Sequence, residues 1–170
     1  MAGPSADPAT VLAAALDRLA AGYTFETTVE VAGKTATTAS GRSIGGSSDF
    51  EVESGGATIT YRSIPPRSWV KQAGKAWVTV DGTVPDGDPL DSLRSPTAVE
   101  AVDGDADVRV RATYPASAFG LTGDAPVSVS LTLNADGSIR ATYRTTTAAG
   151  PASSDTTLTP AASLEPISAP

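Results

Sequence analysis

Residues 23–81 constrain the fold most, because apolar and polar residues alternate there between closely spaced turns. The clearest turn is Ser54-Gly55-Gly56-Ala57, in which two glycines can take the positive φ angles of a tight hairpin. Its register gives two apolar and two polar cross-strand pairs: Val52–Ile59, Phe50–Tyr61, Glu51–Thr60 and Asp49–Arg62. Each kind of pair keeps to one face, as a correct register requires. Residues 23–81 are therefore predicted to form six strands of one antiparallel meander.

The other hairpins of this region follow the same pattern. Tyr23–Val31 alternates as a half-buried strand does, and Ala32-Gly33-Lys34 returns the chain as a strand of small residues over 35–44. Pro65-Pro66 separates the fourth and fifth strands, because proline cannot donate to a ladder. A turn at Ala73-Gly74-Lys75 is expected to put Trp69, Val78 and Val80 on one face, and Val70 and Trp77 on the other. With a tryptophan on each face, we expect both faces to be covered there.

Helices are predicted before and after the meander. Asp7-Pro8 joins a favourable N-cap to proline at the first helical position, and Gly22 ends the helix. Its apolar residues recur at helical spacing: Val11, Leu12, Ala15, Leu16 and Leu19. Asp88-Pro89 repeats the start signal, and Ser95-Pro96 precedes a second short helix predicted over 97–102. We expect all three helices to cover one face of the sheet, with the two short ones acting as a lid.

Strand periodicity returns after the lid, over 107–114 and 127–133. A three-residue loop at 135–137 would pair Leu133 with Ile139, Leu131 with Ala141 and Val129 with Tyr143. A two-residue loop would instead pair Leu133 with Arg140. The longer loop is favoured because it keeps apolar residues on one face and polar residues on the other. Residues 154–159 are predicted as a last short strand.

Composition narrows the chemistry. The 170 residues include no His and no Cys, which removes imidazole bases, thiol nucleophiles, disulfides and the usual zinc ligands. The net charge of -7, without a basic patch, argues against nucleic acid and against binding an anionic membrane by charge. Paired carboxylates, as in glycoside hydrolysis, stay open, but we expect no enzyme activity and no cofactor.

Asp103–Asp107 faintly resembles a calcium loop. The loop pattern needs glycine at its sixth position and glutamate at its twelfth, where this chain has Val108 and Tyr114. We expect a solvated acidic turn and no metal site.

No run reaches the roughly 18 apolar residues of a membrane span. Residues 1–6 read as a disordered linker of the kind that a removed export signal leaves, although a cytoplasmic protein with a loose N-terminus is the alternative. Abundant Ala, Gly, Asp, Arg and Val with few Lys is typical of a GC-rich genome, such as an actinobacterial one.

Four local features carry a resemblance to a known family: the Trp69–Val80 hairpin, the helix start Asp88–Leu93, Tyr114–Ala118 after a strand, and the strand 127–133 turning at 134–137. In this order they resemble the LolA-like lipoprotein carrier fold, and more specifically the LppX and LprG type of exported mycobacterial lipoprotein. The resemblance spans Val11 to Thr159.

The resemblance implies an α+β fold with a single domain. A curved antiparallel half-barrel would be covered on its concave face by the N-terminal helix and the two lid helices. The domain would run over 7–160, followed by a flexible tail over 161–170.

The resemblance also implies a lipid or lipidated ligand, whose acyl chains lie in an apolar cavity between sheet and helices. Such a carrier is expected to be a monomer, anchored by a lipid outside the cytoplasmic membrane. The expected lining residues are Phe25, Val29, Val52, Ile59, Tyr61, Trp69, Val78, Leu90, Leu93, Val129, Leu131 and Tyr143. Taken singly, each of them is better explained as core, and as a group they form a pocket only if the helices leave the concave face unfilled. A module that binds a protein partner through the same fold, with a filled core, is the alternative function.

Overall fold

A computed structural model of the chain describes residues 6–81, 88–102 and 108–170. The first strands are β1 (Tyr23–Val31), β2 (Lys34–Ile44), β3 (Ser47–Ser54), β4 (Ala57–Ile64), β5 (Arg67–Gln72) and β6 (Val78–Val80). The later strands are β7 (Ala98–Val102), β8 (Val108–Tyr114), β9 (Val127–Leu133), β10 (Ile139–Thr147) and β11 (Gly150–Pro160). The helices are α1 (Pro8–Leu19), α2 (Pro89–Leu93) and the short 3-10 helix η1 (Ala116–Phe119).

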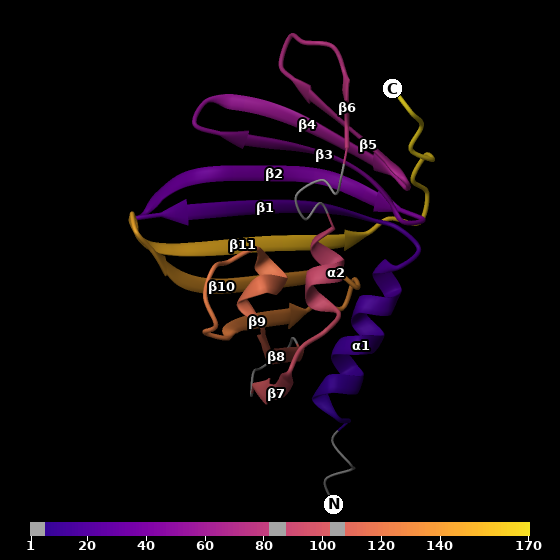
Figure 1. The fold of residues 1–170 in the computed structure, drawn as a ribbon. Helices are drawn as coiled ribbons and strands as arrows, with labels where there is room; N and C mark the ends of the chain where they lie inside the picture. Colours follow the sequence, from indigo (N-terminus) through magenta and orange to yellow (C-terminus); the bar gives the residue numbers. More distant parts are fainter. Residues whose placement is uncertain (1–5, 82–87, 103–107) are drawn as a thin grey trace, which may run out of the picture.

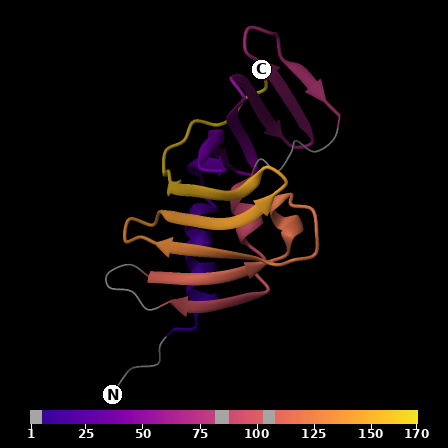
Figure 2. The same ribbon diagram turned by 90° about the vertical axis from the view of Figure 1, so that its left-hand side faces the viewer.

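All eleven strands form one curved antiparallel sheet, in the order β6-β5-β4-β3-β2-β1-β11-β10-β9-β8-β7 (Figure 1). The helices lie on one side of it, which we call the inner face; the other side is the outer face. Figure 2 shows that the strands of the β2–β6 half are turned strongly relative to those of the β7–β11 half. The protein is therefore mostly β, with far less helix than an α+β fold implies.

Two predicted hairpin registers are confirmed. The turn at 54–57 pairs Val52 with Ile59, Phe50 with Tyr61, Glu51 with Thr60 and Asp49 with Arg62. The longer loop at 135–137 pairs Leu133 with Ile139, Leu131 with Ala141 and Val129 with Tyr143. The first helix and all six strands of the meander are also present. For both hairpins, the turn sequence indicates the same register as the requirement that apolar and polar residues lie on opposite faces.

The last strand is longer and more central than predicted. β11 starts at Gly150 and pairs with β10 on one side and with β1 on the other. It therefore joins the N-terminal meander to the later strands, so that one sheet passes through the whole molecule.

The second lid helix was a wrong prediction, because residues 98–102 form β7 at the edge of the sheet. Val99 and Ala101 lie opposite Ala112 and Val110 of β8. The backbone N–H of Thr97 also donates to the carbonyl of Thr113, over 2.7 Å. A run this short fits both the helical and the strand period, and here the free edge of β8 decides in favour of a strand.

The predicted faces at the β5–β6 hairpin were also wrong. Val70 pairs with Val78, so Trp69 lies opposite Thr79 and on the outer face. Trp77 precedes β6 and lies over the guanidinium of Arg62, which is 5.0 Å from the ring centroid. A three-residue turn at 73–75 pairs Val70 with Val78, whereas the predicted faces correspond to a register shifted by one residue, and such a shift exchanges the two faces of a strand.

The core lies beneath the helices, in the β7–β11 half of the sheet. α1 packs on β7 and β11, and its Leu12, Leu16 and Leu19 are buried. They meet buried residues of β8 to β11, including Val110, Val129, Leu131, Ile139 and Leu158. Among the described residues, no helix is long and apolar enough to cross a bilayer.

The C-terminal segment 161–170 crosses the outer face of β2 to β4. The guanidinium of Arg42 donates to the carbonyl of Glu165 over 3.0 Å, and that of Arg62 donates to the carbonyl of Ser168 over 2.9 Å. Arg62 is also paired with Asp49 at 3.0 Å. The segment therefore has a defined course beside the Arg42, Asp49 and Arg62 side chains.

Gly41 is required by the close approach of two strands. A Cβ at this position in β2 would lie 2.3 Å from the Cβ and 2.6 Å from the Cα of Phe50 in β3. Real carbon atoms do not approach so closely, so a larger residue must push the strands apart.

We predict that Gly41→Ala lowers the free energy of unfolding by roughly 1–3 kcal/mol, because overpacking forces backbone shifts. Ser40→Ala, on the neighbouring and exposed outer-face position, should change it by less than about 0.5 kcal/mol. Urea unfolding of the three proteins measures both effects. Equal midpoints for Gly41→Ala and the wild type would show that the two strands are not held at this separation.

Candidate functional site

The inner face of β3 to β6 carries an apolar surface with which no described helix is in extensive contact. We call this surface the open strip; it consists of Val52, Ile59, Tyr61, Val70 and Val78. The first four are half-buried, whereas Val78 is 60% exposed. Contiguous apolar surface left open on a soluble protein commonly marks a binding site.

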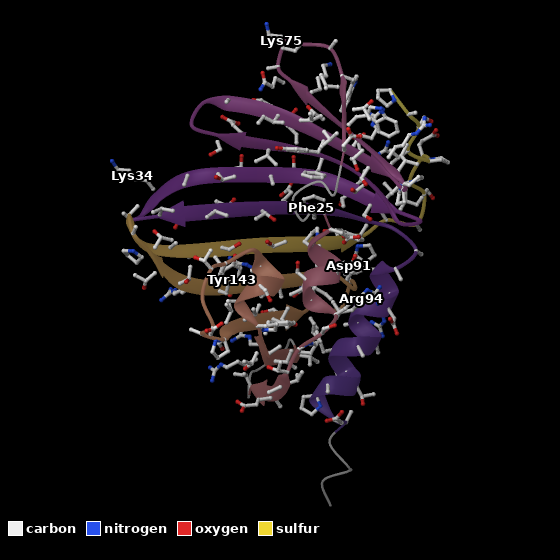
Figure 3. All side chains as sticks on the ribbon, in the orientation of Figure 1. Phe25, Lys34, Lys75, Asp91, Arg94 and Tyr143 are labelled. Carbon is white, nitrogen blue, oxygen red and sulfur yellow. The ribbon has the colours of Figure 1, made fainter. Side chains whose placement is uncertain are left out.

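A row of aromatic rings leads from the core to the open strip. The centroids of Tyr23 and Phe25 are 6.3 Å apart, those of Phe25 and Phe50 are 6.1 Å apart, and Phe50 stacks on Tyr61 at 5.0 Å. Phe25 and Phe50 approach each other across β2 because Gly41 lies between them in the register. Figure 3 shows Phe25 near the middle of the sheet, beside α2.

A row of serines runs parallel to these rings at the α1 end of the sheet. Cross-strand pairs join Ser43 to Ser48, Ser48 to Ser63 and Ser63 to Ser68, with Tyr23 opposite Ser43 at one end. Ser43, Ser48 and Ser68 are only 5%, 7% and 7% exposed, respectively. We call these four residues the serine row. Residues i and i+2 of a strand lie on the same face and are roughly 7 Å apart. Ser48 and Ser63 are therefore the inner-face neighbours of Phe50 and Tyr61 along their strands.

Asp88 fixes α2 against this end of the sheet. Its carboxylate accepts from the backbone N–H of Leu90 over 3.0 Å, which caps the helix, and from the hydroxyl of Tyr23. The hydroxyl of Ser43 donates to the same carboxylate over 3.4 Å. Burial raises the pKa of the Tyr23 phenol, and the neighbouring carboxylate raises it further.

The serine row, α2 and the end of α1 enclose a pocket of about 620 Å³. Its lining also includes Pro65, Pro66, Asp91 and Arg94. The guanidinium of Arg94 lies 3.7 Å from Asp91 and 3.5 Å from Asp17 of α1, and Figure 3 places Asp91 and Arg94 between the two helices. The volume is within the range of roughly 300–1,000 Å³ that is usual for small-molecule sites.

The space beneath the helices is nearly filled. A cavity of about 190 Å³ lies between α2, η1 and the sheet, lined by residues such as Val29, Leu93, Phe119 and Tyr143. This volume is below the usual range for ligand sites. Burial raises the pKa of the Tyr143 phenol, as the apolar lining would lead us to expect.

The twelve lining residues predicted from the sequence fall into four groups. Five are core residues: Phe25, Leu90, Leu93, Val129 and Leu131. Val29 and Tyr143 line the small cavity. Val52, Ile59, Tyr61 and Val78 lie together in the open strip. Trp69 lies apart from all of them, on the outer face.

The serine row was not among the predicted site residues, although the sequence carries a signal for it. The register set by the turn at 54–57 extends to Ser48 opposite Ser63, and the Gly45-Gly46 turn sets Ser43 opposite Ser48. Extending both hairpin registers to their strand ends would have aligned these hydroxyls.

Two serines of this row belong to short patterns that carry nucleophiles in other folds. Gly41–Gly45 matches Gly-x-Ser-x-Gly and Ser68–Lys71 matches Ser-x-x-Lys. The first pattern needs a sharp strand-to-helix turn, but Ser43 lies within β2. Ser68 and Lys71 are three residues apart in β5, so their side chains lie on opposite faces. Neither pattern has the geometry of a nucleophile.

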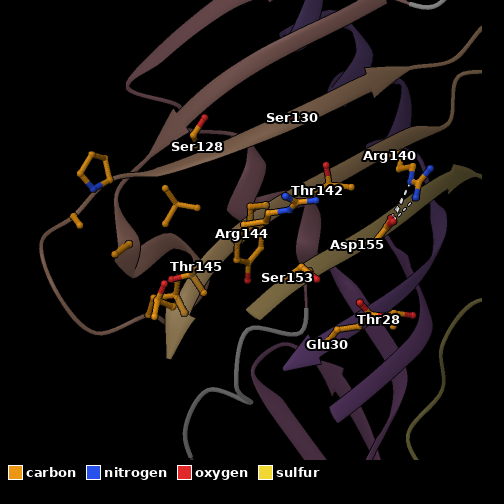
Figure 4. Close-up of a pocket in the computed structure, with 18 of the residues that line it drawn as sticks. Thr28, Glu30, Ser128, Ser130, Arg140, Thr142, Arg144, Thr145, Ser153 and Asp155 are labelled. Carbon is orange, nitrogen blue, oxygen red and sulfur yellow. Dashed lines mark hydrogen bonds and ion pairs between the residues drawn. The ribbon is translucent and has the colours of Figure 1, made fainter. Parts of the chain in front are cut away.

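A larger hollow of about 1290 Å³ lies over the outer face of β1, β9, β10 and β11 (Figure 4). Its floor is hydroxyls and mixed charges, such as Thr28, Glu30, Thr142 and Arg144. The Nε of Arg140 donates to Asp155 over 3.0 Å, and this contact raises the pKa of Arg140. Because Arg140 and Asp155 pair with each other on an exposed surface, and hydroxyls make up much of the remaining lining, we interpret this hollow as a solvated sheet face rather than a built site.

Among the described residues, no group of three or more acidic side chains could hold a metal ion. The acidic turn predicted at 103–107 lies outside the described residues. Comparisons with known proteins give no further assignment: no protein-family model matches the chain, and no curated protein matches it.

We predict that stability falls as the pH rises above about 10, the ordinary pKa of tyrosine. Burial raises the pKa of Tyr23 and of Tyr114 in the native state. Below pH 10 both states are protonated, and the stability is fully present. Above it the unfolded chain ionises first, so each buried tyrosine costs roughly 1.4 kcal/mol per pH unit.

Urea unfolding between pH 9 and 11 measures this slope. Tyr23→Phe should flatten it by about 1.4 kcal/mol per pH unit relative to the wild type, because one ionising group is removed from the unfolded state. The same slope in both proteins would show that Tyr23 ionises equally in the native state.

Proposed function

We propose that the protein binds the acyl chain of an amphiphile on its inner face, along the open strip, and acts as a non-enzymatic carrier. One observation carries this proposal: an apolar surface without a covering helix borders a pocket of about 620 Å³ that has a hydroxyl-lined wall. A ligand with an apolar chain and a polar end matches this arrangement, with its chain on the apolar surface and its polar end at the hydroxyls. The nearly filled space beneath the helices moves the expected site from an enclosed cavity to the open half of the sheet.

Desolvation would supply the affinity. Burying each methylene group contributes about 0.8 kcal/mol, so a twelve-carbon chain could gain about 9–10 kcal/mol before the costs of ordering. Tyr61 and Phe50 would give the chain a flat, rigid support, since aromatic rings bury a large area with few rotatable bonds.

The proposal includes the LolA-like class of lipoprotein carriers, and within it the LppX and LprG type. The support is the curved sheet with helices on one face and the order of the sequence features. The protein would then act outside the cytoplasmic membrane in a lipid-anchored form. These assignments rest on resemblance.

A module that binds a protein partner is the second candidate. It is favoured by the small size of the cavity beneath the helices and by Val78, which is 60% exposed close to the β6 edge. An edge strand can pair with a strand of another protein, and apolar side chains beside it would add to such an interface.

Native mass spectrometry of the freshly purified protein, followed by extraction and lipid analysis, separates the two candidates. A near-stoichiometric acyl lipid, or uptake of an added one, supports the carrier. A clean apo mass with no uptake of added phospholipid or lipopeptide contradicts it and favours the protein-binding module.

We predict that Val70→Ser combined with Val78→Ser weakens binding of a fluorescent twelve-carbon fatty acid by about tenfold or more. Each valine contributes roughly 1.5 kcal/mol when a ligand buries it fully. Val108→Ser is the matched control, because Val108 is 51% exposed but lies in β8, far from the open strip. Fluorescence titration measures affinity, and thermal melts confirm that each variant is folded. Equal losses in the double variant and the control would contradict binding at the open strip.

A further inference from the structure

We propose that the serine row is a headgroup subsite, and that it selects an uncharged, hydroxyl-bearing head of the glycerol type over a phosphate. This inference rests on the proposed function and adds the chemical class of the ligand and its direction on the sheet. The subsite is the pocket of about 620 Å³ bordered by Ser43, Ser48, Ser63 and Ser68.

The hydroxyls of the row line the pocket and keep hydrogen-bonding capacity towards it. Ser48 is 7% exposed, lines the pocket and makes no side-chain hydrogen bond to the described part of the chain. Ser68 donates to Ser63 over 3.2 Å, which leaves the Ser63 hydroxyl proton available. Buried hydroxyl groups normally have partners, and a ligand hydroxyl can serve both as donor and as acceptor.

The charge of the lining disfavours an anion. Asp88 and Asp91 contribute two carboxylates, whereas Arg94 is the one cation among the described lining residues. Arg94 lies within 3.7 Å of Asp91 and 3.5 Å of Asp17, so its charge is already balanced. A phosphate would meet unbalanced negative charge, whereas neutral hydroxyls can donate to the free carboxylate oxygens.

The geometry sets the direction of the ligand. The row Ser48–Ser63–Ser68 lies roughly 7 Å from the row Phe50–Tyr61–Val70, because the two rows are two residues apart along each strand. A head at the serines therefore places the first methylene groups over the rings. The chain then continues towards Val52 and Ile59, the next inner-face pair along these strands.

Three ligands with the same twelve-carbon chain test the assignment: monolauroylglycerol, dodecyl phosphate and dodecyltrimethylammonium. Isothermal titration below the micelle concentration, at one ionic strength, gives an affinity for each. We expect monolauroylglycerol to bind most tightly. Ser48→Ala and Ser63→Ala should each weaken its binding by about fivefold, the size of one lost hydrogen bond, and leave dodecyl phosphate unchanged.

Ser40→Ala is the matched control, since it removes a hydroxyl from the exposed outer face of β2. Tightest binding of dodecyl phosphate or of the ammonium compound, equal binding of all three, or serine variants that match the wild type would overturn the headgroup assignment while lipid binding stands. If no ligand binds to any protein, the proposed function fails and the subsite falls with it.

Discussion

The pairing of β1 with β11 is the constraint on which the rest of the structure depends. β1 is bonded along its nine residues to β11 on one side and to β2 on the other. Strands from opposite ends of the sequence thus lie at the centre of the sheet, and two sets of local hairpins share one inner face. Tyr23 and Phe25 lie where the two sets meet, so the aromatic row continues from the covered core into the open half.

The unequal distribution of the helices creates the candidate site. α1 packs on β7 and β11, and the Asp88 carboxylate holds α2 close to Tyr23. Neither helix is in extensive contact with β3 to β6, which therefore keep a partly open apolar inner face. Along the strands, the side chains on this face change from the serines, through Phe50 and Tyr61, to Val52 and Ile59. That order is what gives the surface an amphipathic direction.

The sequence could predict features that local rules determine. The glycine turn at 54–57 and the loop at 135–137 each agreed with a separation of faces, and both registers followed. Residues 98–102 fit both the helical and the strand period, and they form a strand because the edge of β8 is available for pairing. The face of Trp69 depended on a register shift of one residue. How much of the sheet the helices cover depends on packing between distant elements, so the sequence could not indicate that part of the apolar inner face stays open.

The position of β11 also affects how the chain reaches its folded form. Ribosomal synthesis produces β1 early and β11 last, so the β1 edge that β11 occupies has no partner of its own until residues 150–160 have been made. A nine-residue strand edge with alternating apolar side chains is a template for pairing with another chain. The risk of misassembly therefore depends on the time that passes between the synthesis of β1 and that of β11. This is a kinetic quantity, and the stability of the folded sheet does not determine it.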